Sequence, residues 1–339
     1  MKIVKKFVAL VAVFAIILTA FAACAPKKGN ATPINNPEDF YGHKIAVQSG
    51  TTSFELVTKW NEERGDKDAI TIQPYQKVTE CFSELKLGRV DAVFVDSVVA
   101  EFYTSGSDKA SYKRVWLDSD VEPIAIALRK DRTKLGATID AVLDSLYFDG
   151  KLKEIALKEI GSDMTDGIRQ VTSAPTIPTD FASELKEAGV LHVGYELGYP
   201  PMEYTLDDAK TKVGFDVALA DEIAKLLGLK VVFHDTDWNG IRPALEKGEF
   251  DCIISTFSIN AERQAKYYLT KPYINQAQCI IVLADNKVTE AETTTAPSNS
   301  SSSDTNTSAT TVPTNTSDSS APSDSTASTA PSATPTGAQ

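Results

Sequence analysis

The stretch Lys44–Glu55, KIAVQSGTTSFE, contains a short apolar run, a glycine and the beginning of a helical pattern. Gly50 permits a tight turn because it carries no side chain that could clash. Thr52 and Glu55 have the spacing of a capping box, which predicts that the helix begins at Thr52. Free backbone N–H groups at such a start, with the hydroxyls of Thr51 and Thr52, can hold a small anion such as a carboxylate. A well-capped helix with nothing bound has the same pattern.

The alternation of strand and helix continues through two segments, residues 40–161 and residues 187–286. In the first, strand-like and helical patterns are predicted at 43–47, 52–64, 69–73, 79–88, 90–95, 123–128, 133–148 and 151–160. In the second, they are predicted at 190–195, 216–227, 230–234, 239–247 and 250–255. Strands separated by helices predict an α/β fold with parallel sheets covered on both faces. Ligands of such sheets bind beyond the carboxyl ends of the strands.

The two segments resemble each other and are joined by a predicted linker. The pattern LxxGxxD occurs at residues 85–91 and again at residues 245–251, each time before an apolar run. This pattern indicates a helix, a glycine stop and a buried strand, and it favours two lobes of similar architecture. Residues 162–186 contain Pro175 and Pro178 and show little periodicity, which is typical of a linker.

The first 39 residues read as a targeting segment followed by a linker. Lys2, Lys5 and Lys6 precede the apolar run Phe7–Phe21, and small residues precede Cys24. This arrangement predicts a signal peptide over residues 1–23. The residues FAAC at 21–24 resemble a bacterial lipoprotein lipobox, which would make Cys24 the lipidated first residue of the mature chain, with residues 24–39 as a linker. Ordinary secretion without a lipid is the alternative.

Residues 287–339 consist almost wholly of Ser, Thr, Ala, Pro and Asn with scattered acidic residues. This composition cannot bury enough apolar surface to offset the entropy of the chain, so we expect a disordered tail. A glycosylated or wall-threading stalk and a plain solvated tail remain alternatives.

Charge and composition exclude some classes of partner and site. The formal net charge of −12 argues against nucleic acid or an anionic lipid surface as the main partner. Apart from Cys24 the chain has three cysteines, Cys81, Cys252 and Cys279. We expect buried free thiols, with a Cys252–Cys279 bridge as the alternative. The three histidines, His43, His192 and His234, are far apart and each adjoins an apolar run, so neither a metal site nor a cofactor is predicted.

Polar and aromatic side chains follow the ends of the predicted strands. They are Asp96 in the first segment and Glu196, Tyr199, Trp238, Thr256, Ser258 and Arg263 in the second. Arg263 can grip a carboxylate with two parallel hydrogen bonds. Tyr199 and Trp238 can sandwich an alkyl or cationic group. Asp96 follows a buried strand, where a carboxylate needs a partner such as an ammonium group, although it can also cap a helix over residues 97–103.

The chain resembles the polar amino-acid-binding proteins of ABC importers, a family of bacterial extracellular solute-binding proteins. VGYELGYPPMEY at 193–204 and CIISTFSINAERQ at 252–264 look like the first lobe of that family. HKIAVQSGTTSFE at 43–55 and VDAVFVDSVVA at 90–100 look like its second lobe, with the C-terminal helices following to residue 161. The resemblance implies a two-lobed, periplasmic-binding-protein-like type II fold, with lobe 2 and the C-terminal helices at 40–161 and lobe 1 at 187–286.

The order of the lobes is reversed relative to the family. The resemblance therefore implies a circularly permuted chain, in which residues 162–186 join the family's usual ends. A fragment of a tandem array whose lobes pair between chains is the alternative.

The resemblance also implies roles for single residues. It implies that the α-carboxylate of the ligand is bound by Arg263, Thr256 and Ser258, and by Thr51 and Thr52 of the opposite lobe. It implies that Asp96 binds the α-ammonium group. Tyr199 and Trp238 would stack on the ligand, and Glu196 would face its side chain. Met202 and Asn260 depart from the family pattern of Phe and Thr, so the ligand's identity is less defined than its class. Glu196 indicates a cationic or amide side chain, with other polar side chains as the alternative.

The expected function is capture of a free amino acid between the lobes and its delivery to a membrane permease, without catalysis. The protein is expected at the extracellular face of the cell membrane, anchored by lipid. Two alternatives remain open, an amino-acid-sensing surface lipoprotein and a dehydratase-like enzyme on the same fold.

Overall fold

The computed structural model describes residues 32–64, 69–107, 109–206 and 208–284. Cys24, the predicted signal peptide and the predicted tail lie outside the described residues. Within these ranges, no helix is both long enough and apolar enough to cross a membrane.

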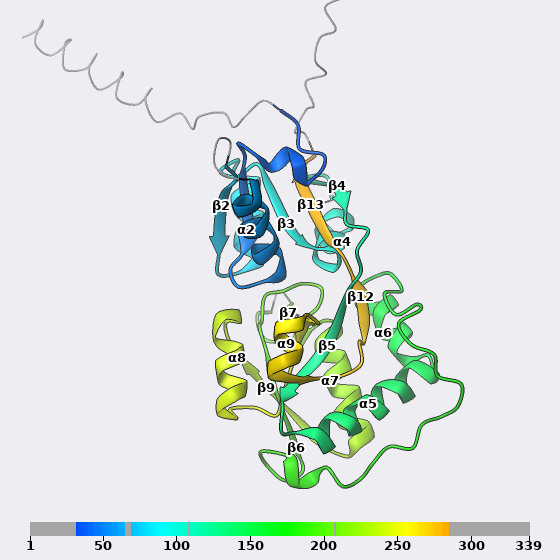
Figure 1. The fold of residues 1–339 in the computed structure, drawn as a ribbon. Helices are drawn as coiled ribbons and strands as arrows, with labels where there is room; N and C mark the ends of the chain where they lie inside the picture. The colour runs from blue at the N-terminus through cyan, green and yellow to red at the C-terminus, as the bar shows by residue number, and fades with distance from the viewer. Residues whose placement is uncertain (1–31, 65–68, 108, 207, 285–339) are drawn as a thin grey trace, which may run out of the picture. The chain divides into compact units, whose positions relative to one another are not determined.

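A five-stranded sheet, here called sheet A, has the strand order β2-β1-β3-β13-β4 (Figure 1). Its strands are β1 (Lys44–Gln48), β2 (Thr71–Tyr75), β3 (Ala92–Asp96), β4 (Tyr112–Leu117) and β13 (Gln278–Leu283). The helical elements that pack with it are η1 (Pro37–Phe40), α2 (Thr52–Arg64), α3 (Val78–Lys86) and α4 (Ser97–Ser105). β1 runs parallel to β2 and β3, whereas β13 is antiparallel to β3 and β4. We call this sheet and its helices lobe A.

A six-stranded sheet, sheet B, has the order β11-β5-β10-β6-β9, and β12 also pairs with β5. Its strands are β5 (Glu122–Arg129), β6 (Val190–Tyr195), β9 (Lys230–Asp235), β10 (Cys252–Ser258), β11 (Tyr267–Leu269) and β12 (Ile274–Gln276). Its helical elements are α5 (Thr133–Phe148), α6 (Lys151–Glu159), η2 (Ala182–Glu184), α7 (Phe215–Leu227), α8 (Trp238–Lys247) and α9 (Ala261–Lys266). A small hairpin of β7 (Tyr204–Thr205) and β8 (Lys212–Val213) completes this part, which we call lobe B.

Strand β1 shows why sheet A needs helices on both faces. Ile45 and Val47 point to one face and pack in a cluster with Val57 of α2, whereas Ala46 lies in a different cluster with Phe82 of α3. Side chains alternate across a strand, so a run of apolar residues is stable only when both faces are covered. Each large aliphatic side chain buried in this way contributes about 1.5–3 kcal/mol.

Two short connections pass between the sheets. Residues 118–121 join β4 to β5, and Ala277 alone separates β12 from β13. β5 pairs with β10 although it lies in the first predicted segment, and β13 pairs with β3 although it lies in the second. Each predicted segment therefore contributes to both sheets. The prediction of parallel sheets is wrong for β5 and β13, because an apolar run in the sequence does not specify which strand it will pair with.

The predicted linker, residues 162–186, packs on lobe B at several points. Arg169 forms an ion pair of 2.7 Å with Asp144 of α5, and its side chain is almost fully buried. The carboxylate of Glu184 accepts a 2.8 Å hydrogen bond from the backbone N–H of Leu135 at the start of α5. These contacts hold the segment against α5.

Candidate functional site

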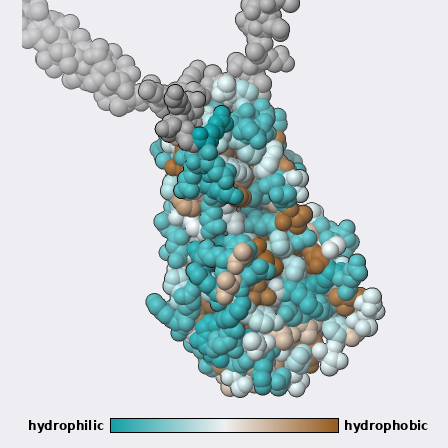
Figure 2. All heavy atoms as spheres, viewed as in Figure 1, coloured by the Kyte–Doolittle hydropathy of each residue, from teal (hydrophilic) through white to brown (hydrophobic). Residues whose placement is uncertain are grey.

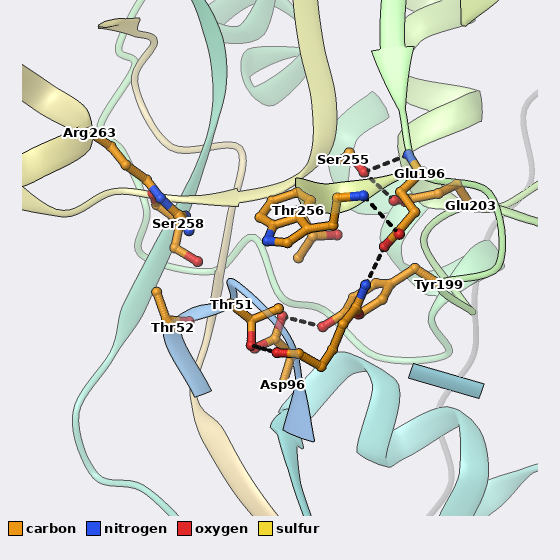
Figure 3. A pocket seen from close by; sticks show the side chains of 12 residues that line it. Thr51, Thr52, Asp96, Glu196, Tyr199, Glu203, Ser255, Thr256, Ser258 and Arg263 are labelled. Atoms are coloured by element: carbon orange, nitrogen blue, oxygen red, sulfur yellow. Dashed lines mark hydrogen bonds between the residues drawn. The ribbon is translucent and has the colours of Figure 1, made fainter. Parts of the chain in front are cut away.

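A cavity lies where the two lobes meet, and Figure 3 shows its side chains; its empty space, open solvent included, is about 310 Å³. Its lining comprises Gln48, Thr51, Thr52, Asp96, Glu196, Tyr199, Glu203, Trp238, Ser255, Thr256, Ser258 and Arg263. All nine ligand-binding residues predicted from the sequence are in this set. Gln48, Glu203 and Ser255 also line the cavity and were missed by the sequence reasoning. Ser255 lies in the stretch CIISTFSINAERQ at 252–264, and its position beside Thr256 and Ser258 was the signal that could have identified it.

Arg263 presents a buried cation to the cavity. The backbone N–H of Arg263 donates a 2.8 Å bond to the side chain of Asn260, which caps α9. Its guanidinium is 2% exposed and donates from Nη1 to the carbonyl of Ser258 at 3.0 Å. Nε and Nη2 have no hydrogen-bond partner among the described residues. Burial lowers the pKa of Arg263, because the charged form has lost water and gained no anion.

Two aromatic rings hold the guanidinium in place. Its central carbon lies 4.4 Å from the centroid of the Phe257 ring and 5.7 Å from that of Trp238. Such cation–π contacts favour a positive charge that has no carboxylate beside it. The unpaired N–H groups of Arg263 are therefore available to an anionic group in the cavity.

Thr256 lies in β10 with a left-handed backbone, φ 46°, where the pairing of β10 with β5 changes register. The carboxylate of Asp216 holds this conformation, since Oδ2 accepts from the Thr256 backbone N–H at 2.7 Å and from its hydroxyl at 3.2 Å. Strained backbone of this kind persists only where the surroundings fix it. Asp216 thereby sets the direction in which the end of β10 faces the cavity.

Asp96 is the acidic residue that lobe A contributes to the cavity. It ends β3 and accepts hydrogen bonds from the Tyr199 hydroxyl at 2.6 Å and from Gln278 Nε2 at 2.8 Å. Burial, and then the nearby Glu122 carboxylate, raise the pKa of Asp96 to about 6. Asp96 occupies the N-cap position of α4, but its side chain makes no capping bond there. Its carboxylate serves the cavity rather than the helix.

Tyr199 and Trp238 bridge the lobes. The Trp238 indole N–H donates to the carbonyl of Gly50 at 2.8 Å. Gly50 has φ 74°, and a Cβ on it would lie 2.4 Å from the Asn239 side chain, so the lobes approach closely at this turn. Both aromatic rings are buried. Their burial against the opposite lobe shows that the described conformation is a closed one.

Glu196 is nearly fully buried at the end of β6, and its carboxylate already has partners. Oε1 accepts from Lys77 Nζ at 3.1 Å and from the Trp238 backbone N–H at 3.0 Å, while Oε2 accepts from Gln48 Nε2 at 2.5 Å. Burial raises the pKa of Glu196, and the Lys77 charge partly offsets that rise. Sequence reasoning missed Lys77, because one lysine before a helical pattern gives no signal of a partner in the other lobe.

Glu203 and Asp216 form a buried carboxyl pair beside the cavity. The Ser255 hydroxyl donates to Glu203 Oε1 at 2.5 Å. Glu203 Oε2 and Asp216 Oδ1 are buried acceptors that no described group donates to. Burial raises the pKa of Glu203 well above its ordinary value, with the Asp216 charge adding to the rise.

The turn after β1 differs in detail from its prediction. The helix α2 does begin at Thr52, but the capping hydroxyl is that of Thr51, which accepts from the Phe54 backbone N–H at 3.2 Å. Thr51 also donates to the carbonyl of Gln48 at 2.7 Å. The predicted cap at Thr52 is therefore one residue late, because the chain tightens around Gly50 before the helix begins.

Cysteines and histidines take no part in the cavity. Cys81, Cys252 and Cys279 are buried free thiols, which confirms that prediction over the alternative of a bridge. His192 and His234 are far apart in the sequence, but their ring nitrogens lie 2.8 Å apart on adjacent strands β6 and β9, which the sequence did not predict. Among the residues that the structure describes, no group of side chains is arranged to hold a metal ion.

Comparison with known proteins finds similarity over one part of the chain. Residues 191–326 match the family of bacterial extracellular solute-binding proteins, family 3. The L-cystine-binding protein TcyJ of Escherichia coli strain K12 is 37% identical over 91 residues, which cover 27% of this chain and 34% of that protein. A cyclohexadienyl dehydratase of Pseudomonas aeruginosa is 34% identical over 101 residues, which cover 30% of this chain and 37% of that protein.

Among solved structures, an ancestral cationic amino-acid solute-binding protein is 42% identical over 23% of this chain and 33% of that chain, with a TM-score of 0.22. The chain thus spans about a third of the length of the curated relatives that it matches first. Over residues 191–326, the chain is similar to the bacterial extracellular solute-binding proteins of family 3.

Proposed function

We propose that this protein captures a free polar amino acid in the cavity between lobe A and lobe B. The observation that carries the proposal is the guanidinium of Arg263, which is buried, lines the cavity and has two nitrogens without a partner among the described residues. An α-carboxylate fits those nitrogens with charge-assisted hydrogen bonds. Asp96, from the other lobe, fits the α-ammonium group.

Capture would proceed by closure of the lobes about the two connections at 118–121 and Ala277. Lobe B contributes Arg263 and lobe A contributes Asp96, so neither lobe alone holds both ends of a zwitterion. Interactions made by both lobes favour the closed state once the ligand is bound. The hydrogen bonds Tyr199–Asp96 and Trp238–Gly50 show which protein contacts would accompany closure.

The wider role that we propose is delivery of the amino acid to the permease of an ABC importer. Similarity to the extracellular family and the names of the relatives support this role. We also propose that lipid on Cys24 anchors the protein at the outer face of the membrane. Labelling of the intact chain with a radioactive fatty acid, compared with Cys24→Ser, tests the anchor.

The reversed order of the lobes supports a circular permutation of the family's chain. Ile34 and Phe40, near the first described residue, share a hydrophobic cluster with Ile280 and Val282, near the last. Ends that pack together can be joined, and a new pair of ends can be opened elsewhere. A tandem-array fragment whose lobes pair between chains predicts a concentration-dependent monomer–dimer shift, which sedimentation would detect.

Calorimetry with Arg263→Ala tests the proposed function after a thermal-shift screen has found the amino acid. We expect the substitution to weaken binding by about 2 kcal/mol or more, because the buried carboxylate loses its counter-charge. Arg89→Ala is the matched control, since Arg89 is exposed and pairs with Glu84 outside the cavity. Unchanged affinity in Arg263→Ala would remove this residue from the site.

One observation favours a second candidate function. The Glu203 carboxyl, whose pKa is raised by burial, lines the cavity and is a candidate proton donor to a bound acid. One relative is a cyclohexadienyl dehydratase, so dehydration of a cyclohexadienyl acid is the reaction to assay. Turnover that disappears in Glu203→Gln would establish the enzyme and displace the binding role.

A further inference from the structure

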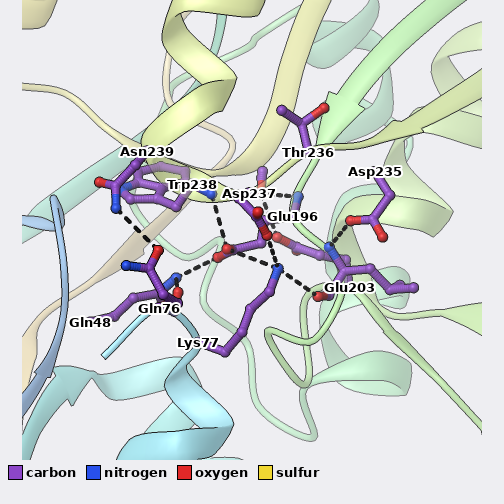
Figure 4. A network of polar contacts seen from close by, with 12 residues as sticks. Gln48, Gln76, Lys77, Glu196, Glu203, Asp235, Thr236, Asp237, Trp238 and Asn239 are labelled. Atoms are coloured by element: carbon purple, nitrogen blue, oxygen red, sulfur yellow. Dashed lines mark hydrogen bonds and ion pairs between the residues drawn. The ribbon is translucent and has the colours of Figure 1, made fainter. Parts of the chain in front are cut away.

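The carboxylate of Glu196 is neutralised by the protein itself. Figure 4 shows Lys77, Gln48 and the backbone of Trp238 converging on it. Oε1 accepts two hydrogen bonds, and Oε2 accepts one. A carboxylate that is 3% exposed and already accepts three hydrogen bonds gains little from pairing with a second cation.

Lys77 reaches this position from the opposite lobe. It stands at the N-cap of α3 in lobe A, and the contacts of its ammonium group are with lobe B. Its Nζ lies 3.1 Å from Glu196 Oε1, 3.1 Å from Asp237 Oδ1 and 3.4 Å from the carbonyl of Leu197. The Lys77 side chain is 26% exposed and that of Glu196 is 3% exposed, so only the Glu196 end of the ion pair is shielded from water. Lys77 is not among the residues that line the cavity, so its charge acts on a ligand through Glu196, which does line it.

Gln48, at the same end of the cavity, has a buried side-chain oxygen that lacks a hydrogen-bond donor among the described residues. Its Nε2 donates to Glu196 Oε2 at 2.5 Å and to the carbonyl of Gln76 at 3.0 Å. Its Oε1 is buried, and no described group donates to it. Gln48 is 4% exposed and lines the cavity. A buried acceptor without a donor is costly, so a ligand that brings a hydrogen-bond donor relieves that cost.

We propose that Lys77 is a specificity-determining residue: it supplies the counter-charge of Glu196, so that the cavity selects an amino acid with an uncharged, hydrogen-bond-donating side chain and disfavours a cationic one. This inference rests on the proposed function and deepens it. The sequence alone left a cationic and an amide side chain open for Glu196. The ion pair with Lys77 favours the amide or a hydroxyl, because a ligand cation would meet a like charge and an occupied carboxylate.

The experiment measures dissociation constants of glutamine and arginine by calorimetry for the wild-type chain and four variants. We expect the wild type to bind glutamine more tightly than arginine. Lys77→Met should raise arginine affinity about tenfold or more relative to glutamine, because Glu196 is then free to pair with the ligand. Lys77→Arg keeps the charge and should keep the wild-type preference.

Two further variants show whether the gain comes from Glu196. In the double variant Lys77→Met, Glu196→Gln the gain for arginine should vanish, since no carboxylate is left to be paired. Lys59→Met is the control for loss of one positive charge, because Lys59 is exposed on α2 and forms an ion pair there with Glu63. This control should leave the ratio of the two affinities unchanged. Circular dichroism and thermal melting establish that each variant is folded.

The outcomes separate the inference from the proposed function. A wild type that binds arginine more tightly than glutamine, or a folded Lys77→Met without a gain for arginine, overturns the inference and leaves amino-acid capture standing. A chain that binds no free amino acid in the wild type or in Lys77→Met overturns both. A gain that persists in the double variant assigns the selectivity to another group and also overturns the inference.

Discussion

The hydroxyl of Tyr199 in lobe B donates a 2.6 Å hydrogen bond to the carboxylate of Asp96 in lobe A. This contact joins the residue expected to stack on the ligand to the residue expected to hold its ammonium group. Asp96 is buried, and Gln278 Nε2 also donates to it. The closed state of the lobes and the charge state of the cavity are therefore linked through one carboxylate.

Tyr199→Phe removes one of the donors to the buried Asp96 carboxylate. We expect amino-acid affinity to fall by about 1–3 kcal/mol, because the ring remains while the hydrogen bond across the lobes is lost. Calorimetry measures the change. Tyr204→Phe, outside the cavity lining, is the control. Equal affinities for the wild type and Tyr199→Phe would show that the contact does not accompany binding.

Affinity for the amino acid should depend on pH through Asp96. Its pKa is raised to about 6 by burial and by Glu122, so the carboxylate is neutral below that pH and cannot pair with an ammonium group. We expect affinity to be level above about pH 6 and to fall below it. Titration calorimetry at several pH values measures the profile. Asp96→Asn should bind more weakly and lose the fall; a wild-type affinity that rises as the pH is lowered would contradict this role.

Arg263→Met should stabilise the ligand-free protein. The wild-type guanidinium is buried with two unpaired nitrogens, and replacing such an ion by an apolar side chain removes its desolvation cost. We expect the free energy of unfolding to rise by about 1 kcal/mol or more in urea titrations without ligand. Added amino acid should then stabilise the wild type only. A less stable Arg263→Met would show that the guanidinium stabilises the fold through its contacts with the neighbouring aromatic rings and the Ser258 carbonyl.

Glu203→Gln should change how stability varies with pH. The pKa of Asp216 is about 6 in the folded chain against an ordinary 3.8, and that of Glu203 is also raised, so the folded chain holds more protons than the unfolded chain in this range. The free energy of unfolding therefore falls as the pH rises from about 4 to 6, and further as Glu203 ionises. In Glu203→Gln an amide replaces the protonated acid and donates to Asp216 at every pH. Urea unfolding across this pH range should show a shallower fall in the variant. Asp96 keeps part of the slope, and an unchanged slope would show that the pair does not share a proton.

Local patterns determined much of the secondary structure. The predicted and observed bounds agree for α2, α5 and β6, because amphipathic spacing, caps and glycine stops act over a few residues. The nine predicted ligand-binding residues meet at one cavity, since they follow the ends of strands and such ends gather at one edge of a sheet. The placement of these side chains at one cavity was thus predictable from their positions along the strands.

Only the tertiary structure decided the strand partners and the charge pairs. β5 and β13 exchange sheets, Lys77 meets Glu196 at a separation of 119 residues, and His192 meets His234 on the neighbouring strand. The buried pair of Glu203 and Asp216 likewise forms only when α7 packs against the end of β10. Contacts of this kind depend on the path of the chain between distant residues, and no local periodicity or capping rule carries that path.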